Sequence, residues 1–386
     1  MGTTEFGTSH RQGRTANRLV AATGVGLLVI LSSGVATAHE RPDLFGTTTV
    51  LVANRTGLGA AKVDPNLLNP WGLSKLPTSP VWISDNHANV STLALGGTAA
   101  APAGVTVPPL VVTVPGGPTG QIANATTGFK LSNGSPAVFV FANEEGELWG
   151  WNRASGTAAE RTVQVAGGNL KGLAQTSVAG LSYLLGANFT LGRIDVIDST
   201  WQSASWPGAF SVRHLPKGFS PFNVQTLRDA SGADHVFVAY ALRDPVTNDE
   251  VAGRRLGLVT EFTPDGKFIR RFERNGMNAP WGLALAPASW GAHAGELLVG
   301  QFGNGQVEMY DAMDGDHSGT LSDGDGHPLV IDGLWALLAG DATSGGVGSV
   351  LFTAGPNEEA DGIYGIITVS EPNGDGDGDS EGGHSD

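Results

Sequence analysis

Side chains that carry oxygen recur directly after short apolar runs of this 386-residue chain. Carboxylate and amide oxygens are the ligands that hard cations such as Ca²⁺ prefer, and a bound cation can polarise a substrate oxygen. If the fold gathers these positions, they would form a calcium site with ligands from several distant segments. The predicted metal ligands are Asp85, Asn143, Asn188 and Glu358. Asn and Asp are also common in turns, and a purely structural role there is the alternative.

A second set of residues combines amides, indoles, an imidazole and an ammonium, which together can bind an organic ligand through hydrogen bonds and stacking. These residues lie just before or just after the same apolar runs. They are Asn69, Trp71, Asn86, His87, Lys171, Asn223, Trp281 and Gln301. Whether either set forms a site depends on the elements that carry it.

Catalytic motifs are absent from the sequence. It contains no H-E-x-x-H, no G-x-S-x-G and no G-x-x-x-x-G-K-[ST]. It has no cysteine, which excludes disulfides, thiol catalysis and Cys-based zinc sites. The nine histidines are scattered, and the adjacent pairs Glu144-Glu145 and Glu358-Glu359 are typical of solvated turns. The sequence therefore identifies no catalytic residue.

Six units of similar length carry the candidate residues. The first apolar residue after each turn signal recurs at intervals of 49, 51, 51, 59 and 51 residues. The six positions are Leu73, Ile122, Leu173, Val224, Leu283 and Leu334. Short alternating runs and glycine-rich turns within each unit predict an all-β fold, a six-bladed β-propeller over residues 44–370 with one four-stranded blade per unit. A helical solenoid is the alternative, but no unit has an apolar stripe of helical period.

A propeller would bring both sets of residues together. The loop before the innermost strand of a blade and the loop after its second strand open on the same face. Both sets lie in or beside those loops, and symmetry brings one such loop from every blade to the axis. We therefore expect the functional site at the axial mouth of this face.

Pro-Trp-Gly-Leu occurs twice, at residues 70–73 and 280–283. Proline restricts the backbone, glycine permits a turn, and tryptophan is large enough to fill the space between blades. We expect Trp71 and Trp281 to pack between blades, and a place in a ligand pocket is the alternative.

The run Thr47–Asn54 precedes the first unit. We expect it to form an N-terminal strand beside Gly362–Val369, which would close the last blade and remove the free edge between the ends of the ring.

Residues 1–38 have the features of a signal peptide. Three arginines precede the apolar run Leu19–Leu31, and Ala36-Thr37-Ala38 matches a cleavage site. An uncleaved anchor over residues 19–38 is the alternative. The remaining segments are predicted as a short linker over residues 39–43 and a disordered acidic tail over residues 371–386.

The charge balance argues against nucleic acid as a partner. Removal of residues 1–38 takes away three arginines and one glutamate, which leaves 19 basic and 36 acidic residues and a formal net charge of −17. Such a surface repels phosphate backbones. We expect a secreted or cell-surface-associated monomer with no stable membrane span after cleavage.

The segment Tyr310–Pro328 is rich in aspartate, and its spacing does not match an EF-hand loop. We expect a turn-rich solvated loop, with weak calcium binding between blades as the alternative. The residues concerned are Asp311, Asp314, Asp316, Asp323 and Asp325.

Several longer motifs carry a resemblance to known propellers. They are NPWGLS, WISDN, FANEEGELWGWN, APWGLALAP, DGLWAL and LFTAGPNEEADGIYGII. With them the chain, over about residues 44–370, resembles an uncharacterised family of secreted bacterial six-bladed β-propellers. It is also similar to NHL-repeat and gluconolactonase-like propellers. The resemblance implies the fold and export, and it implies no reaction.

Two functions from different classes fit the sequence. The first is an extracellular module that binds a small molecule, a protein or a polysaccharide at the axial mouth. The alternative is a metal-dependent hydrolase or lyase of the gluconolactonase-like class, with Ca²⁺ as the candidate cofactor. The absence of a catalytic motif favours the binding module.

Overall fold

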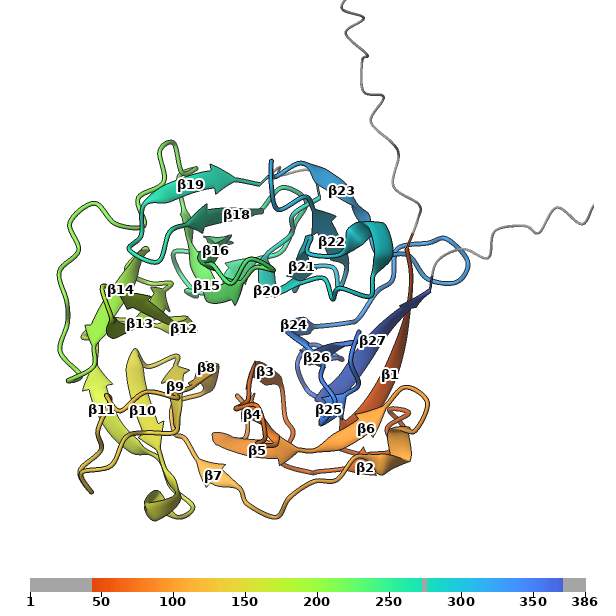
Figure 1. Ribbon diagram of the computed structural model, residues 1–386, viewed down its shortest axis with the longest axis horizontal. Coiled ribbons are helices and arrows are strands. Elements are labelled where there is room, and N and C mark those ends of the chain that lie inside the picture. The colour runs from red at the N-terminus through yellow and green to blue at the C-terminus, as the bar shows by residue number, and fades with distance from the viewer. Residues whose placement is uncertain (1–43, 273–275, 371–386) are drawn as a thin grey trace, which may run out of the picture. The chain divides into compact units, whose positions relative to one another are not determined.

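Short strands and glycine-containing turns make up most of the computed structural model, which describes residues 44–272 and 276–370 (Figure 1). Six of its sheets are arranged as blades around a central axis, so the predicted all-β six-bladed propeller is confirmed. All these residues belong to the second of two units into which the chain divides, Met1–Glu40 and Arg41–Asp386.

Three blades have four strands each, which follow one another outward from the axis. Blade 1 contains β3 (Pro70–Ser74), β4 (Val81–Asp85), β5 (Val90–Ala94) and β7 (Val112–Thr113). Blade 2 contains β8 (Pro118–Ala123), β9 (Phe139–Asn143), β10 (Glu147–Trp151) and β11 (Glu160–Gln164). Blade 5 contains β20 (Pro280–Leu285), β21 (Leu297–Gln301), β22 (Val307–Tyr310) and β23 (His317–Thr320).

Blades 3 and 4 depart from the predicted four-strand pattern. Blade 3 has only three strands among the described residues: β12 (Leu170–Val178), β13 (Leu181–Asn188) and β14 (Arg193–Asp198). The prediction of a fourth strand is wrong here because residues 199–218 form turns, with one isolated bridge between Ile197 and Ser203. Blade 4 contains β15 (Phe219–Arg228), β16 (Asp234–Arg243), β18 (Gly257–Phe262) and β19 (Phe268–Arg271), and β17 (Glu250–Val251) pairs with the end of β16.

Both ends of the described chain contribute to blade 6. Its strands from the axis outward are β24 (Leu334–Ala339), β26 (Val350–Ala354), β27 (Ile363–Ser370) and β1 (Phe45–Ala53), and the short β2 (Lys62–Val63) pairs with the end of β1. β1 is antiparallel to β27, with Thr47 opposite Thr368. The predicted closure of the last blade by an N-terminal strand is therefore confirmed.

The remaining elements are short. They are β2 (Lys62–Val63), β6 (Gly96–Thr98), β25 (Ser344–Gly345) and the 3-10 helices Pro102–Gly104, Arg153–Ser155 and Gly291–His293.

Each innermost strand has an irregular register near its start. The irregularity falls between Pro70 and Leu73 in β3 and between Pro280 and Gly282 in β20, and bulges of this kind re-aim side chains. We call the first residue within the irregularity of each blade, taken together, the axial six. Its members are Trp71, Thr119, Lys171, Phe222, Trp281 and Trp335.

Neighbouring innermost strands approach closely beside the axial six. A Cβ atom on Gly72 would lie 2.5 Å from Thr119 O, and one on Gly282 would lie 2.5 Å from Trp335 O. Glycine is required at both places because any side chain would push two blades apart.

The predicted signal peptide, linker and acidic tail lie outside the described residues. Within residues 44–272 and 276–370, no helix has the length and apolarity needed to cross a membrane.

Candidate functional site

Three tryptophans of the axial six fill the centre of the propeller. Trp71 stacks on Trp335 with ring centroids 3.6 Å apart, and Trp281 meets both edge-on at 6.0 and 5.8 Å. Phe222 joins them, with its ring 6.4 Å from that of Trp71. Trp71 thus contacts residues of blades 4 and 5, which are not its neighbours. The expected packing of Trp71 and Trp281 between blades is present, since both contact Trp335 of the adjacent blade 6. The bulges turn these rings toward the axis, where they form an aromatic plug.

Lys171 is the charged member of the axial six. Its Nζ lies 4.9 Å from the centroid of the Trp71 ring, and its side chain is only 3% exposed. Glu144 Oε1 lies 2.8 Å from this ammonium, and Glu250 Oε2 lies 3.8 Å from it. Burial opposes the charge, but the two carboxylates outweigh burial and raise the pKa of Lys171 above its usual value. The ammonium is therefore charged, and it lies between carboxylates of two other blades.

Three glutamates from different blades lie within the electrostatic influence of this ammonium. Glu144 follows β9, Glu250 lies on β17 and Glu359 follows β26. Burial raises the pKa of Glu250 and of Glu359, and the charge of Lys171 partly counteracts the shift in each case. Glu250 is nearly buried, whereas Glu144 and Glu359 are about one-third exposed. The mouth therefore presents the carboxylates of Glu144 and Glu359 to solvent, with Glu250 beneath them.

Amides of blade 1 hold two of these carboxylates in place. Asn69 Nδ2 donates to Glu359 Oε2 at 2.6 Å, while Asn69 Oδ1 accepts from Trp335 Nε1 at 2.9 Å. Asn86 Nδ2 donates to Glu144 Oε2 at 3.2 Å. Asn69 thus connects the polar cluster at the mouth directly to the aromatic plug.

His87 is the most exposed polar side chain of the cluster, with 49% of its surface accessible. Its Nε2 lies 3.3 Å from Asn69 Nδ2 and 3.9 Å from Glu359 Oε2. It therefore borders the position that a ligand above the plug would occupy.

Five of the eight predicted ligand-binding residues meet at the mouth. They are Asn69, Trp71, Asn86, His87 and Lys171. Trp281 and Asn223 lie deeper: Trp281 Nε1 donates to Lys171 O at 3.1 Å, and Asn223 Nδ2 donates to Trp281 O at 2.7 Å. Gln301 is fully buried in blade 5, where its Oε1 accepts from Asn278 N at 2.7 Å.

Three of the four predicted metal ligands, Asp85, Asn143 and Asn188, accept hydrogen bonds within their own blades. Asn143 Oδ1 accepts from Glu147 N at 2.7 Å, and Asn188 Oδ1 accepts from Leu191 N at 3.0 Å. Asp85 is fully buried in blade 1, and Glu358 is exposed in the turn after β26. Each of these amide oxygens thus caps a turn, and calcium binding by the four residues stays a prediction.

The aspartates of Tyr310–Pro328 also cap turns. Asp311 Oδ1 accepts from Met313 N at 2.7 Å, and Asp323 Oδ1 accepts from Asp325 N at 2.9 Å. Potential ligand atoms of Asp323, Asp325 and His327 lie within 4.8 Å of one another, and two of the three side chains are exposed. Hydrogen bonding within the turns accounts for this arrangement.

Asp85 is an acidic residue at a repeat position where two other blades have asparagine, so its replacement by asparagine tests the effect of the buried carboxyl on stability. It is the last residue of β4, where β9 and β13 end in Asn143 and Asn188. Burial raises the pKa of Asp85 well above its usual value, and its Oδ1 has no hydrogen-bond partner among the described residues. Because the folded-state pKa exceeds the unfolded one, the carboxyl destabilises the fold increasingly as pH rises above about 4. We expect Asp85→Asn to stabilise the protein at neutral pH by on the order of 1–3 kcal/mol.

Urea unfolding at pH 7 and pH 4 measures this effect. The gain should shrink at pH 4, where the carboxyl of the parent protein holds its proton in the folded state. Asp314→Asn, at an exposed turn position, is the control and should change little. A loss of stability at pH 7 would contradict the interpretation of Asp85 as an uncompensated buried acid.

The sequence does not predict two residues of the mouth and the plug, Glu250 and Trp335. Glu250 lies in the long insertion of the fourth unit, which has no counterpart in the other units. Trp335 lies in DGLWAL, which lacks the Pro-Trp-Gly signal. The pairing of β24 with β26 makes Leu337, not Leu334, the equivalent of Leu73. In this register Trp335 occupies the repeat position that Trp71 occupies in blade 1.

Comparisons with known proteins bear on the fold more than on the site. No family model matches the chain. An uncharacterized protein of Acanthamoeba polyphaga mimivirus is 29% identical over 329 residues, which are 82% of this chain and 78% of that protein. A second uncharacterized protein of the same virus is 28% identical over 340 residues, with 83% and 85% covered.

Solved structures share the arrangement of blades. An α-L-arabinofuranosidase of Fusarium graminearum, in complex with an iminosugar inhibitor, matches with a TM-score of 0.52 at 10% identity, over 84% of this chain and 98% of that chain. An α-L-arabinanase of Penicillium chrysogenum, complexed with arabinobiose, gives a TM-score of 0.50 with the same identity and coverage. At this identity the likeness shows the propeller fold alone.

Proposed function

We propose that the protein is a binding module that takes a small ligand rich in hydrogen-bond donors at the axial mouth. Suitable ligands carry several hydroxyls or a protonated amine. The observation that carries this proposal is the cluster around Lys171, in which one buried ammonium meets glutamates of other blades above an aromatic plug. Carboxylates that are only partly exposed can accept such donors without full competition from water.

Packing alone does not account for a charge at this position. Four of the axial six are aromatic, and an aromatic or aliphatic side chain at position 171 would fill the same space. A buried ion pair contributes little net stability compared with apolar residues of similar volume, because its charges must lose their hydration. We infer that Lys171 serves the ligand site by fixing Glu144 and Glu250 at the mouth.

The charges of the cluster select the class of ligand. Glu144, Glu250 and Glu359 surround one ammonium, and Asp249 adds a further negative charge nearby. This excess of carboxylates repels anions and attracts neutral donors and cations. Because burial raises the pKa of Glu250 and Glu359, acidification neutralises them early, and binding of an amine should weaken as pH falls.

Melting temperatures in the presence of small probes test the proposal, since a ligand that binds only the folded state raises them. Low-millimolar glucose, arabinose, ethanolamine and spermidine represent the favoured classes, and glucuronate represents the anions. We expect at least one favoured probe to stabilise the parent protein and glucuronate to have no effect. Glu359→Gln should lower the affinity about tenfold, because it removes one charged hydrogen bond of about 1.5 kcal/mol.

Glu358→Gln is the matched control, since Glu358 is exposed in the same turn and belongs to no contact described at the mouth. It should bind as the parent protein does. Equal effects of the two substitutions, or a response to glucuronate alone, would contradict the proposed site.

A hydrolase or lyase is the second candidate function. The favouring observation is the raised pKa of Glu250 and Glu359, since a carboxyl that holds its proton can act as a general acid. The oxygens near Lys171 do not suit a divalent cation, because the ammonium already occupies the space between Glu144 and Glu250. A metal-dependent reaction would need the four predicted ligands instead, and calcium chloride in the same melts tests for them.

We expect the module to act outside the cytoplasm as a monomer. The support is the signal-like pattern of residues 1–38 and the closure of the ring by β1, which covers the edge of β27. Recovery of a native chain that begins at His39 would agree with export.

A further inference from the structure

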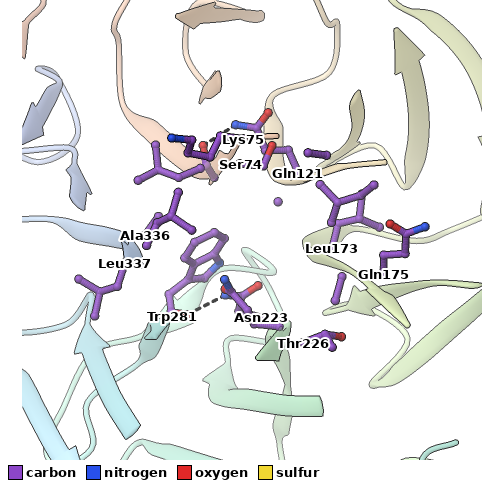
Figure 2. Close-up of a pocket in the computed structure, with 18 residues that line it drawn as sticks. Ser74, Lys75, Gln121, Leu173, Gln175, Asn223, Thr226, Trp281, Ala336 and Leu337 are labelled. Carbon is purple, nitrogen blue, oxygen red and sulfur yellow. Dashed lines mark hydrogen bonds between the residues drawn. The ribbon is translucent and has the colours of Figure 1, made fainter. Parts of the chain in front are cut away.

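A pocket of about 530 Å³ lies between blades 4 and 5. It is larger than the cavity around the axis, which Gln121 and Trp281 line and which measures about 230 Å³ (Figure 2). Three turns contribute to the larger pocket: residues 229–233 between β15 and β16, residues 286–296 between β20 and β21, and residues 311–316 between β22 and β23. Each of these turns joins its two strands at the ends away from the mouth. The pocket therefore lies at the face opposite the mouth, and we call it the inter-blade pocket.

Apolar side chains that a ligand can reach form much of the wall. Ala230, Ala292, Ala294 and Met313 are exposed, and Leu285 is half-buried. Methionine adapts to irregular partners and makes favourable contacts with aromatic rings. Pockets for small molecules measure about 300–1,000 Å³, and the inter-blade pocket lies within this range. The wall and the volume therefore suit a ligand with a small apolar or aromatic body.

Asp229 supplies a reachable negative charge to the lining, because its side chain is 39% exposed. The hydroxyl of Ser231 and the N–H of Ala233 donate to its Oδ1 at 2.7 and 2.9 Å. These hydrogen bonds lower the pKa of Asp229 to about 2, so the carboxylate is charged at neutral pH. Within residues 44–272 and 276–370, no lysine or arginine forms an ion pair with Asp229. Its charge is therefore available to a ligand.

The other buried charges of the lining are paired with each other. Glu261 Oε2 lies 2.7 Å from Arg270 Nε, and Arg270 Nη1 also donates to Met313 O of the neighbouring blade. Glu261 Oε1 lies 2.7 Å from His235 Nδ1, which fixes the imidazole. The His235 side chain is 28% exposed, and its Nε2 lies 3.3 Å from Asp229 Oδ2. A ligand in the pocket can therefore approach Asp229 and His235 together.

The pairing of these two side chains indicates the class of ligand. A neutral imidazole has one N–H, and the short contact with Glu261 Oε1 uses it. His235 Nε2 and Asp229 Oδ2 are then two neighbouring acceptors with no proton between them. A protonated amine can donate to both at once, whereas Asp229 repels an anion. We propose that the inter-blade pocket is a second binding site, independent of the mouth, for an amine that carries a small apolar or aromatic body.

Isothermal titration calorimetry at pH 8, which favours the neutral imidazole, tests this proposal. The probes are phenethylamine, phenethyl alcohol and phenylacetate, which share a phenyl ring and differ in the polar group. We expect saturable binding of phenethylamine, at least tenfold weaker binding of phenethyl alcohol and no binding of phenylacetate. Asp229→Asn keeps an oxygen to cap the turn but removes the charge, and it should weaken phenethylamine about tenfold, which is about 1.4 kcal/mol.

Asp198→Asn is the matched control. Asp198 Oδ1 accepts from Thr200 N at 2.8 Å, from Thr200 Oγ1 at 2.6 Å and from Gln202 N at 3.1 Å, which is the capping pattern of Asp229. Asp198 lies in blade 3 and does not line the inter-blade pocket. The control variant should therefore bind phenethylamine as the parent protein does.

Met313→Arg is a second variant that leaves the core intact, since the Met313 side chain projects into solvent at the pocket. The added cation should weaken phenethylamine at least tenfold. Glu359→Gln should bind phenethylamine normally, which separates this site from the mouth. Absence of saturable heat with phenethylamine, equal binding of the three probes, or equal affinities of the parent, Asp229→Asn and Met313→Arg would overturn the proposal.

Discussion

Deletion of residues 44–54 is expected to abolish folding of the propeller. This segment contains β1, the N-terminal strand of blade 6, which pairs with β27 from Phe45 to Ala53. Leu44, Leu51 and Val52 are at most 2% exposed, and the burial of each such side chain is worth about 1.5–3 kcal/mol. With the hydrogen bonds of the ladder, the loss approaches the whole stability of a typical domain, which is about 5–15 kcal/mol.

Near-ultraviolet circular dichroism and gel filtration report the outcome. The truncated chain should lose its tertiary signal and aggregate through the exposed edge of β27. A chain that begins at residue 44 is the control and should fold. A synthetic peptide of residues 44–54, added in excess, should restore part of the signal by occupying the vacated edge. A truncated monomer that melts like the parent protein would show that closure by β1 is dispensable.

Replacement of Trp335 by alanine is expected to have the second-largest effect. Its ring is fully buried, stacks on Trp71 at 3.6 Å and on Phe302 at 4.1 Å, and donates through Nε1 to Asn69. Truncation of a buried aromatic residue costs about 3–5 kcal/mol. We expect a loss of this size in the free energy of unfolding, measured by urea titration.

Trp335→Phe separates packing from the hydrogen bond. It should recover much of the stability, but Asn69 would lose the indole donor that orients it toward Glu359. Ligand binding at the mouth should therefore weaken in Trp335→Phe by more than its stability loss explains. An unfolding free energy that Trp335→Ala leaves unchanged would contradict the role of the plug.

The repeat period carries most of the information about the fold. Its spacing of about 50 residues predicts the number of blades, their second strands and the closure by the N-terminal strand. All six predicted apolar positions lie in innermost strands. The exact register is harder to predict, because a bulge adds a residue without any change in composition. In blade 2 the position equivalent to Leu73 holds the polar Gln121, one residue before Ile122, and in blade 6 Leu334 takes the position of Pro70, so that Leu337 is the equivalent of Leu73.

The candidate site was only partly predictable because side-chain direction is set by tertiary contacts. Asn69 and Asn143 belong to the same residue type and both lie at strand ends, yet Asn69 contacts blade 6 and Asn143 caps its own turn. The sequence does not distinguish these cases, because a contact with another blade and a cap of the local turn both satisfy the hydrogen-bonding groups of an asparagine side chain. Glu250 reaches the mouth on an insertion whose path no repeat predicts.

The pairing of β1 with β27 also determines when the protein can finish folding during its synthesis. Phe45 leaves the ribosome more than 300 residues before Ser370, the residue opposite it in the ladder. Contacts of such sequence separation form slowly, and domains of this size expose unpaired strands to aggregation meanwhile. The nascent chain can therefore complete blades 1 to 5 one after another, but its first strand must wait, unpaired, for the last strand of the domain to be translated.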